Sequence, residues 1–126
     1  MQVVHVRNVT RGVDLATRVE VAASPWRRFV GLMGKRNLPA GGGLIIRPCN
    51  SIHMFFMRMP LDVLYCGASG PDGDPVLRVL AGIKPWRVGP IVRGSKYVLE
   101  LPAGTVARTG TQQHDVIRSE PSVVQF

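Results

Sequence analysis

The stretch LATRVEVAASPWRRFVGLMG, residues 15–34, contains the change of hydrophobic period that decides the fold class. Its first part alternates along the chain. One set of side chains is Leu15, Thr17, Val19 and Val21, and the other is Ala16, Arg18, Glu20 and Ala22. A period of two residues is typical of a β-strand with one buried face. We therefore expect a strand over residues 15–22.

The second part of the same stretch has a helical period. Ser24 is a suitable N-cap, and Pro25 suits the first helical position. The apolar side chains then follow at i, i+3, i+4 and i+7, as Trp26, Phe29, Val30 and Met33. This spacing predicts one main helix over about residues 24–34, with these four side chains facing the sheet and Gly34 at its end.

The rest of the chain reads as short strands separated by turns, because its 14 Gly and 10 Pro fall between apolar runs. We expect strands at residues 2–9, 43–47, 51–57, 61–66, 75–81, 96–101 and 115–119, and a helical turn near 103–109. The strands at 61–66 and 75–81 should form a hairpin. The predicted fold is a single α+β, β-rich domain over residues 1–126, with a mainly antiparallel twisted sheet or small barrel of about six to eight strands.

Composition limits the function classes. The chain has 126 residues, a 45% hydrophobic content and a net charge of +8, with its basic residues scattered except near Arg27, Arg28, Lys35 and Arg36. No apolar run reaches the roughly 18 residues of a membrane span, and the N-terminus lacks the pattern of a signal peptide. We therefore expect a cytoplasmic protein without a membrane partner, whose two cysteines are free thiols. Nucleic acid, anionic lipid or a small anion are the partners that the charge would attract, but the scattered arginines favour an ordinary solvated surface.

The stretch CNSIHMFFMRMPLDVLYC, residues 49–66, holds the candidate site. If its first part is extended, Cys49, Ser51 and His53 point to one side. Asp62 follows in an apolar strand and should be a paired, partly buried carboxylate, bound to His53, to Arg58 or to backbone amides near Pro60. The group has three readings: a structural hydrogen-bonded pair, a polar ligand pocket, or a nucleophilic Cys49 with His53 as base and Asp62 orienting it. Zinc could be held by Cys49, His53, Asp62 and Cys66, but their spacing does not match a zinc finger or knuckle and disfavours this alternative.

Other residues leave alternatives open. Arg58 and Trp86 are candidate ligand contacts, although for Trp86 the favoured role is to anchor its proline-flanked loop against the sheet. Glu100 is either the solvent face of an edge strand or a carboxylate paired with Arg47 or Arg58. The methionines Met54, Met57 and Met59 are expected to fill the core.

Three blocks resemble one family. These blocks are RRFVGLMGKRNLPAGGGLII (27–46), CNSIHMFFMRMPLDVLY (49–65) and YVLELPAGTVARTG (97–110), and together they resemble the domain of unknown function 192 family of bacteria and archaea. The resemblance implies a compact, β-rich α+β domain and no established reaction. The family usually has Gly-Asp where this chain has His114-Asp115, which implies a strained or reshaped turn here.

We therefore expect a non-enzymatic or small-ligand-binding domain with a polar site around Cys49, Ser51, His53 and Asp62, and with no cofactor or metal. Two alternatives stay open. One is a Cys-His hydrolase or transferase that uses Cys49 as its nucleophile. The other is a nucleic-acid-binding domain that uses the basic surface.

Overall fold

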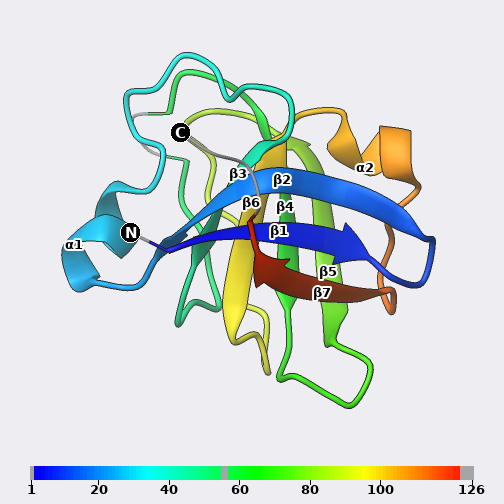
Figure 1. Ribbon diagram of the computed structural model, residues 1–126. Coiled ribbons are helices and arrows are strands. Elements are labelled where there is room, and N and C mark those ends of the chain that lie inside the picture. Colours follow the sequence, from blue (N-terminus) through cyan, green and yellow to red (C-terminus); the bar gives the residue numbers. More distant parts are fainter. Residues whose placement is uncertain (1, 55–56, 123–126) are drawn as a thin grey trace.

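The computed structural model describes residues 2–54 and 57–122, and these form a closed seven-stranded barrel with two short helices (Figure 1). The elements in chain order are β1 (Val3–Asn8), β2 (Val13–Ala22), α1 (Pro25–Val30), β3 (Gly42–Ile46), β4 (Leu61–Cys66), β5 (Asp74–Ile83), β6 (Tyr97–Pro102), α2 (Thr105–Thr109) and β7 (Val116–Pro121). Around the barrel the strands run β1-β2-β3-β6-β4-β5-β7. Neighbours are antiparallel except β2 and β3, which are parallel. The predicted fold class is confirmed.

The barrel has two cores, because several strands bury both of their faces. Side chains that point inward, such as Leu64 on β4 and Leu99 on β6, belong to a cluster inside the barrel. Their neighbours Val63 and Val98 point outward and belong to a second cluster, which includes Met54, Met57 and Met59. The second core therefore lies between the outer surface of the sheet and the segment that precedes β4. The methionines fill this core, as predicted.

The helix α1 is shorter than the sequence predicts, and the prediction that its apolar side chains face the sheet is wrong for Trp26 and Phe29, whereas Met33 packs partly buried against the second core. Trp26 is 71% exposed and Phe29 59% exposed. The helix ends at Gly31, where φ is +50° and the amide donates to the Arg27 carbonyl. Because the chain leaves the helix there, Leu32 rather than Met33 becomes the buried residue.

The predicted strand over residues 51–57 is also wrong for the residues that are described. Phe55 and Phe56 lie outside the described residues. This segment forms only an isolated bridge between His53 and Val88. Irregular hydrogen bonds join it to the loop after β5: Gly89 donates to Ile52 and Val92 donates to Asn50. The Met-rich segment and residues 86–92 thus form a layer over the outer face of the barrel. The β4–β5 hairpin and the helical turn α2 are confirmed.

Candidate functional site

A small pocket of about 50 Å³ lies where α1, the segment after β3 and the outer face of β6 meet. Cys49, Ser51 and His53 all line it, so three of the four residues of the predicted site share one pocket. The other residues that line it are Arg28, Phe29, Val30, Gly31, Leu32, Met33, Ile46, Ile52, Met57 and Glu100. Most of this wall is apolar, which makes its few polar groups energetically important.

Glu100 is the polar group that sequence reasoning placed wrongly. It is neither on a solvent-facing edge nor paired with Arg47 or Arg58: β6 lies between β3 and β4, and the side chain is only 3% exposed. Within the described part of the chain, its Oε1 atom has no hydrogen-bond partner. Burial raises the pKa of this carboxyl from its ordinary 4.5 to about 8. Glu100 is therefore a neutral acid at pH 7, able to donate a hydrogen bond into the pocket.

Gly31 leaves room beside this acid. A Cβ atom at Gly31 would lie 3.6 Å from Ile46 Cδ1 and 3.9 Å from Glu100 Oε1. The residue also has a φ of +50°, which L side chains rarely adopt. The glycine that ends α1 therefore keeps the wall of the pocket open above Glu100.

Arg28 supplies a second unsatisfied group. Its Nη1 donates to the Pro48 carbonyl at 3.1 Å, which fixes the guanidinium against the segment after β3. Its Nε atom is buried and has no hydrogen-bond partner among the described residues. A buried N–H without an acceptor is costly. The pocket is thus lined by a cation and a neutral acid, each with one buried polar atom, Arg28 Nε and Glu100 Oε1, that has no hydrogen-bond partner among the described residues.

Cys49 does not have the surroundings of an activated thiol. Its Sγ donates to the Ser51 carbonyl at 2.7 Å. Burial raises the pKa of the Cys49 thiol, and the nearby Arg28 lowers it only as a minor opposing effect. A nucleophilic cysteine needs a depressed pKa. The geometry therefore supports a packed thiol in the pocket wall, beside the His53 ring, which lies 6.0 Å from that of Phe29.

Asp62 is paired and buried, but it does not line this pocket. Its carboxylate accepts hydrogen bonds from the backbone amides of Gly82 and Val106, both at 2.8 Å. The sequence predicted a paired carboxylate, with backbone amides near Pro60, His53 or Arg58 as partners, whereas these amides come from β5 and α2. Arg58 and Trp86 are both exposed, and neither lines the pocket.

A larger cavity of about 430 Å³ lies at one end of the barrel, around Asp74, Tyr97 and Arg118. Its polar groups already have partners. Asp74 accepts from Ser69 and from the Tyr97 hydroxyl, both at 2.5 Å, and Arg118 donates to the Asp72 carbonyl at 2.8 Å. Burial further raises the pKa of Tyr97. We regard this cavity as a weaker candidate because it has fewer unmet polar groups.

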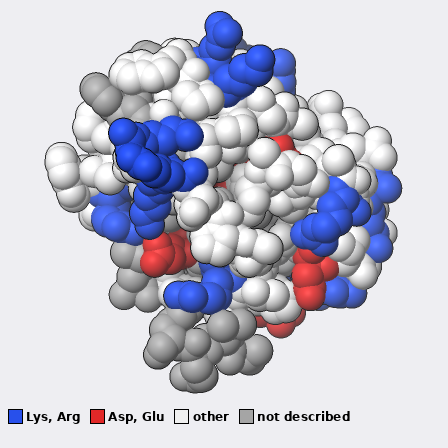
Figure 2. Space-filling model, turned by 90° about the horizontal axis from the view of Figure 1, so that it is seen from above, with Lys and Arg blue, Asp and Glu red and all other residues white. Residues whose placement is uncertain are grey.

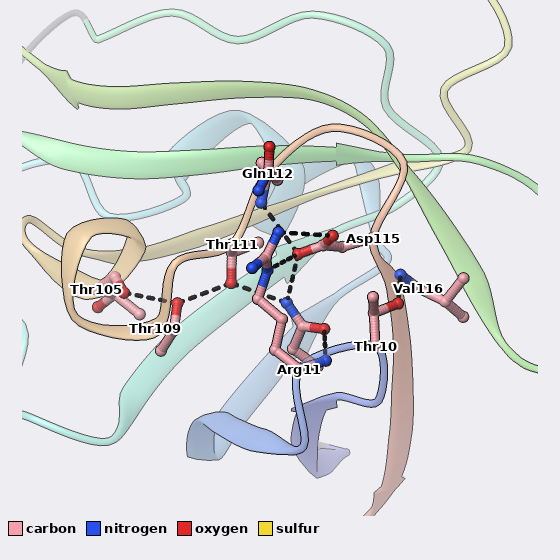
Figure 3. Close-up of polar contacts among 9 residues, drawn as sticks. Thr10, Arg11, Thr105, Thr109, Thr111, Gln112, Asp115 and Val116 are labelled. Atoms are coloured by element: carbon pink, nitrogen blue, oxygen red, sulfur yellow. Dashed lines mark hydrogen bonds and ion pairs between the residues drawn. The ribbon is translucent and has the colours of Figure 1, made fainter.

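A third polar cluster fixes the loops at the other barrel end (Figure 3). The buried Asp115 accepts hydrogen bonds from Asn8 Nδ2 at 2.9 Å, Arg11 Nε at 2.6 Å and the Gln112 amide at 3.1 Å. Burial raises the pKa of Asp115, but these hydrogen bonds outweigh it and lower the pKa overall. Every polar group is satisfied internally, so this cluster stabilises the fold. The sequence pointed to the turn at His114-Asp115. It gave no sign that Asn8, which lies 107 residues from Asp115 in the chain, would be a hydrogen-bond partner of this carboxylate.

A metal site is not evident in the described part of the chain, where no group of three or more His, Cys, Asp or Glu side chains is placed to hold an ion. The zinc alternative considered from Cys49, His53, Asp62 and Cys66 thus gains no support from the geometry.

These features define a class of protein: a small closed β-barrel with a second core on its outer face and a polar pocket in that core. The chain belongs to the DUF192 family, described as "Uncharacterized ACR", whose model matches residues 6–119. A UPF0127 protein of Thermococcus sibiricus is 34% identical over 103 residues, and the match covers 79% of this chain and 64% of that protein. A UPF0127 protein of Pyrococcus furiosus is 29% identical over 113 residues, which cover 86% of this chain and 91% of the relative.

Two solved structures share the fold. A "putative transcription regulator" from Sinorhizobium meliloti 1021 superposes with a TM-score of 0.77 at 26% identity, with 94% of this chain and 92% of that chain covered. A protein of unknown function from Novosphingobium aromaticivorans gives a TM-score of 0.75 at 26% identity, covering 92% of this chain and 83% of the other.

Proposed function

We propose that this protein is a small-ligand-binding module and that its ligand sits in the pocket lined by Cys49, Ser51, His53 and Glu100. The observation that carries the proposal is the Glu100 carboxyl, which is buried in the pocket wall without a hydrogen-bond partner among the described residues. Leaving such a group unpaired costs about 1–3 kcal/mol. A ligand that satisfies it recovers part of this free energy as affinity.

The chemistry of the pocket favours a small oxyanion such as a carboxylate. Arg28 contributes a guanidinium group and Glu100 a neutral carboxyl group to the lining of the pocket, and both groups carry donors that suit a carboxylate ligand. The pocket volume of about 50 Å³ admits a molecule of only a few non-hydrogen atoms. This agrees with the small anionic ligand expected from the sequence.

Catalysis by Cys49 is not favoured, because burial raises the pKa of its thiol and the Sγ hydrogen donates to the Ser51 carbonyl. Asp62, which the catalytic reading needs beside His53, uses its carboxylate to bind the Gly82 and Val106 amides instead. A binding site requires neither an activated thiol nor an orienting carboxylate.

Nucleic-acid binding is the second candidate function, because one similar structure is described as a "putative transcription regulator" and this chain has a net charge of +8. Figure 2 shows Lys and Arg side chains on one face in several groups with uncharged surface between them. Such scattered charge gives weak, sequence-independent attraction to a polyanion. We therefore rank this candidate below the pocket.

The test is stabilisation by small anions at constant ionic strength. We expect formate or acetate, compared with chloride, to raise the melting temperature of the wild-type protein at pH 6 and less so at pH 9, where Glu100 ionises. Glu100→Leu removes the donor and Arg28→Gln removes the cation, so both should weaken the effect. Arg58→Gln is the matched control, since Arg58 is exposed and does not line the pocket. Equal responses in all three variants and the wild type would refute the proposal.

A further inference from the structure

The exposed large apolar side chains of the described residues are confined to two short segments. Trp26 and Phe29 lie on α1, and Trp86, Val88 and Ile91 lie in the loop after β5. Their exposed fractions are 71%, 59%, 59%, 64% and 76%, in that order. Contiguous exposed apolar surface of this kind usually marks a binding site. We call these five side chains the apolar face.

The two segments meet in space, although about 60 residues separate them in sequence. The rings of Trp26 and Phe29 are 6.2 Å apart, and the Phe29 ring is 6.0 Å from that of His53. His53 in turn forms the isolated bridge with Val88. The Trp86 amide donates to the Met54 carbonyl at 2.7 Å, which fixes the loop against the same segment. The contacts that run from Trp26 through Phe29 and His53 to Val88 therefore place α1 beside the loop that carries Trp86, Val88 and Ile91.

The two stretches of sequence that carry the apolar face are rich in basic residues, although Arg27 on α1 is paired with Glu20 at 3.6 Å. The sequence contains no Asp or Glu between Glu20 and Asp62, and none between Asp74 and Glu100. These two stretches supply both halves of the apolar face, and they carry 11 of the chain's 16 basic residues. The exposed basic side chains nearest in sequence to the loop half are Lys84, Arg87 and Arg93. A partner that is both apolar and anionic complements such a surface.

We propose that the apolar face docks this protein on the surface of an anionic lipid bilayer. Tryptophan suits the interface between headgroups and acyl chains, because its ring is apolar and its N–H is polar. Lys and Arg near such residues bind anionic headgroups. The aliphatic Val88 and Ile91 gain free energy in acyl chains but offer no ring for stacking on bases, so a bilayer fits this face better than single-stranded nucleic acid does.

Peripheral contact of this kind needs no membrane-spanning segment. No helix in the described part of the chain is long and apolar enough to cross a membrane. The sequence-based expectation of no membrane partner rested on the absence of a spanning segment and on the scattered basic residues. Side chains that meet from α1 and the loop after β5 form an attachment surface that no single run of sequence contains.

The experiment uses the protein's own fluorescence, because both of its tryptophans lie on the apolar face. The protein is titrated with vesicles of phosphatidylcholine containing about 30% phosphatidylserine, and with vesicles of phosphatidylcholine alone. We expect a blue shift of the emission with the anionic vesicles, quenching by brominated acyl chains, and weaker binding as salt increases. The Ile91→Ser and Trp26→Ala variants should each lower the partition coefficient by about tenfold.

Two pairs of variants separate a localised site from general charge. The first double variant replaces Arg87 and Arg93 by Ser, and the second replaces Arg7 and Arg118 by Ser. Each removes two exposed positive charges, but only the first pair lies in the stretch that carries the apolar face. We expect the first pair to weaken vesicle binding more. Equal weakening by the two pairs, or no blue shift with the anionic vesicles, would overturn the proposal. Tight binding of a labelled 20-nucleotide oligothymidylate without vesicle binding would make nucleic acid the partner instead. A dimer that forms as the protein concentration rises would make a second copy of this chain the partner.

Discussion

The carboxylate of Asp62 on β4 accepts a hydrogen bond of 2.8 Å from the backbone amide of Val106, in the first turn of α2. The helix begins after Gly104, which has no side chain to cap it. Asp62 therefore supplies the cap of α2 from β4. Its second oxygen accepts a hydrogen bond from the Gly82 amide near the end of β5. One buried carboxylate joins three elements.

Replacing Asp62 by Ala should destabilise the protein by about 2–4 kcal/mol, because two amides lose their acceptor. Asp62→Asn should cost roughly half as much, since its amide nitrogen cannot accept a hydrogen bond. Urea denaturation measures both. Asp72→Asn, at an exposed carboxylate, should stay within about 0.5 kcal/mol of the wild type. Equal stability of all the proteins would contradict this assignment.

The stability of the protein should fall as pH rises from about 5 to 8. Burial raises the pKa of Glu100 to about 8 in the folded state, so the unfolded chain releases this proton first. In that window the folded state binds more protons, and the free energy of unfolding decreases by up to about 1.4 kcal/mol per pH unit. Denaturant melts at several pH values should show a flatter profile for Glu100→Gln. The exposed control Glu120→Gln should follow the wild type.

Cys49 should react slowly with iodoacetamide at pH 7–8, because burial raises the pKa of its thiol. Cys66 is fully buried and its thiol pKa is raised to about 12, so it should react only after unfolding. Tryptic digestion and mass spectrometry distinguish the two sites, since Arg58 lies between them. Faster alkylation of Cys49 than of a model thiol at pH 6–7 would reinstate the nucleophilic reading.

His114→Gly should stabilise the protein by about 0.5–1 kcal/mol. His114 is exposed and has a φ of +78°, a conformation that suits glycine better than any residue with a Cβ atom. The strained turn expected from the family's usual Gly-Asp is thus present. The hydrogen bond from the backbone amide of residue 114 to the Val76 carbonyl would be kept. His114→Ala is the control: it removes the imidazole but retains the Cβ atom, so thermal melts should show no comparable gain.

Asp115→Ala should cost about 3–5 kcal/mol, because it leaves Arg11, Asn8 and the Gln112 amide without their shared acceptor. Its pKa is lowered in the folded state, so this contribution is present at neutral pH and is lost as pH falls below about 4. Asp14→Ala removes an exposed partner of Arg7 and should cost about 0–1 kcal/mol. Similar losses at the two positions would show that the Asp115 cluster contributes no more than a surface pair.

The sequence by itself predicted every strand of the barrel, and it failed only in adding one over residues 51–57. Alternating side chains over residues 15–22 predict β2, and the short apolar run over 61–66, between Pro60 and a turn-rich segment, predicts β4, because both patterns are local properties of the chain. It also placed Cys49, Ser51 and His53 together, since residues close in sequence share a surface even where the strand expected there is absent.

The tertiary structure alone decided which faces are buried and what the polar groups contact. Glu100 is buried because β6 is covered on its outer side, and Asp62 accepts hydrogen bonds from amides 20 and 44 residues away. Trp26 and Phe29 have a helical apolar pattern, yet Gly31 ends the helix early and leaves both rings exposed, next to a loop from far along the chain. Local sequence does not encode such long-range pairings, because they depend on how the barrel closes and which segment covers it.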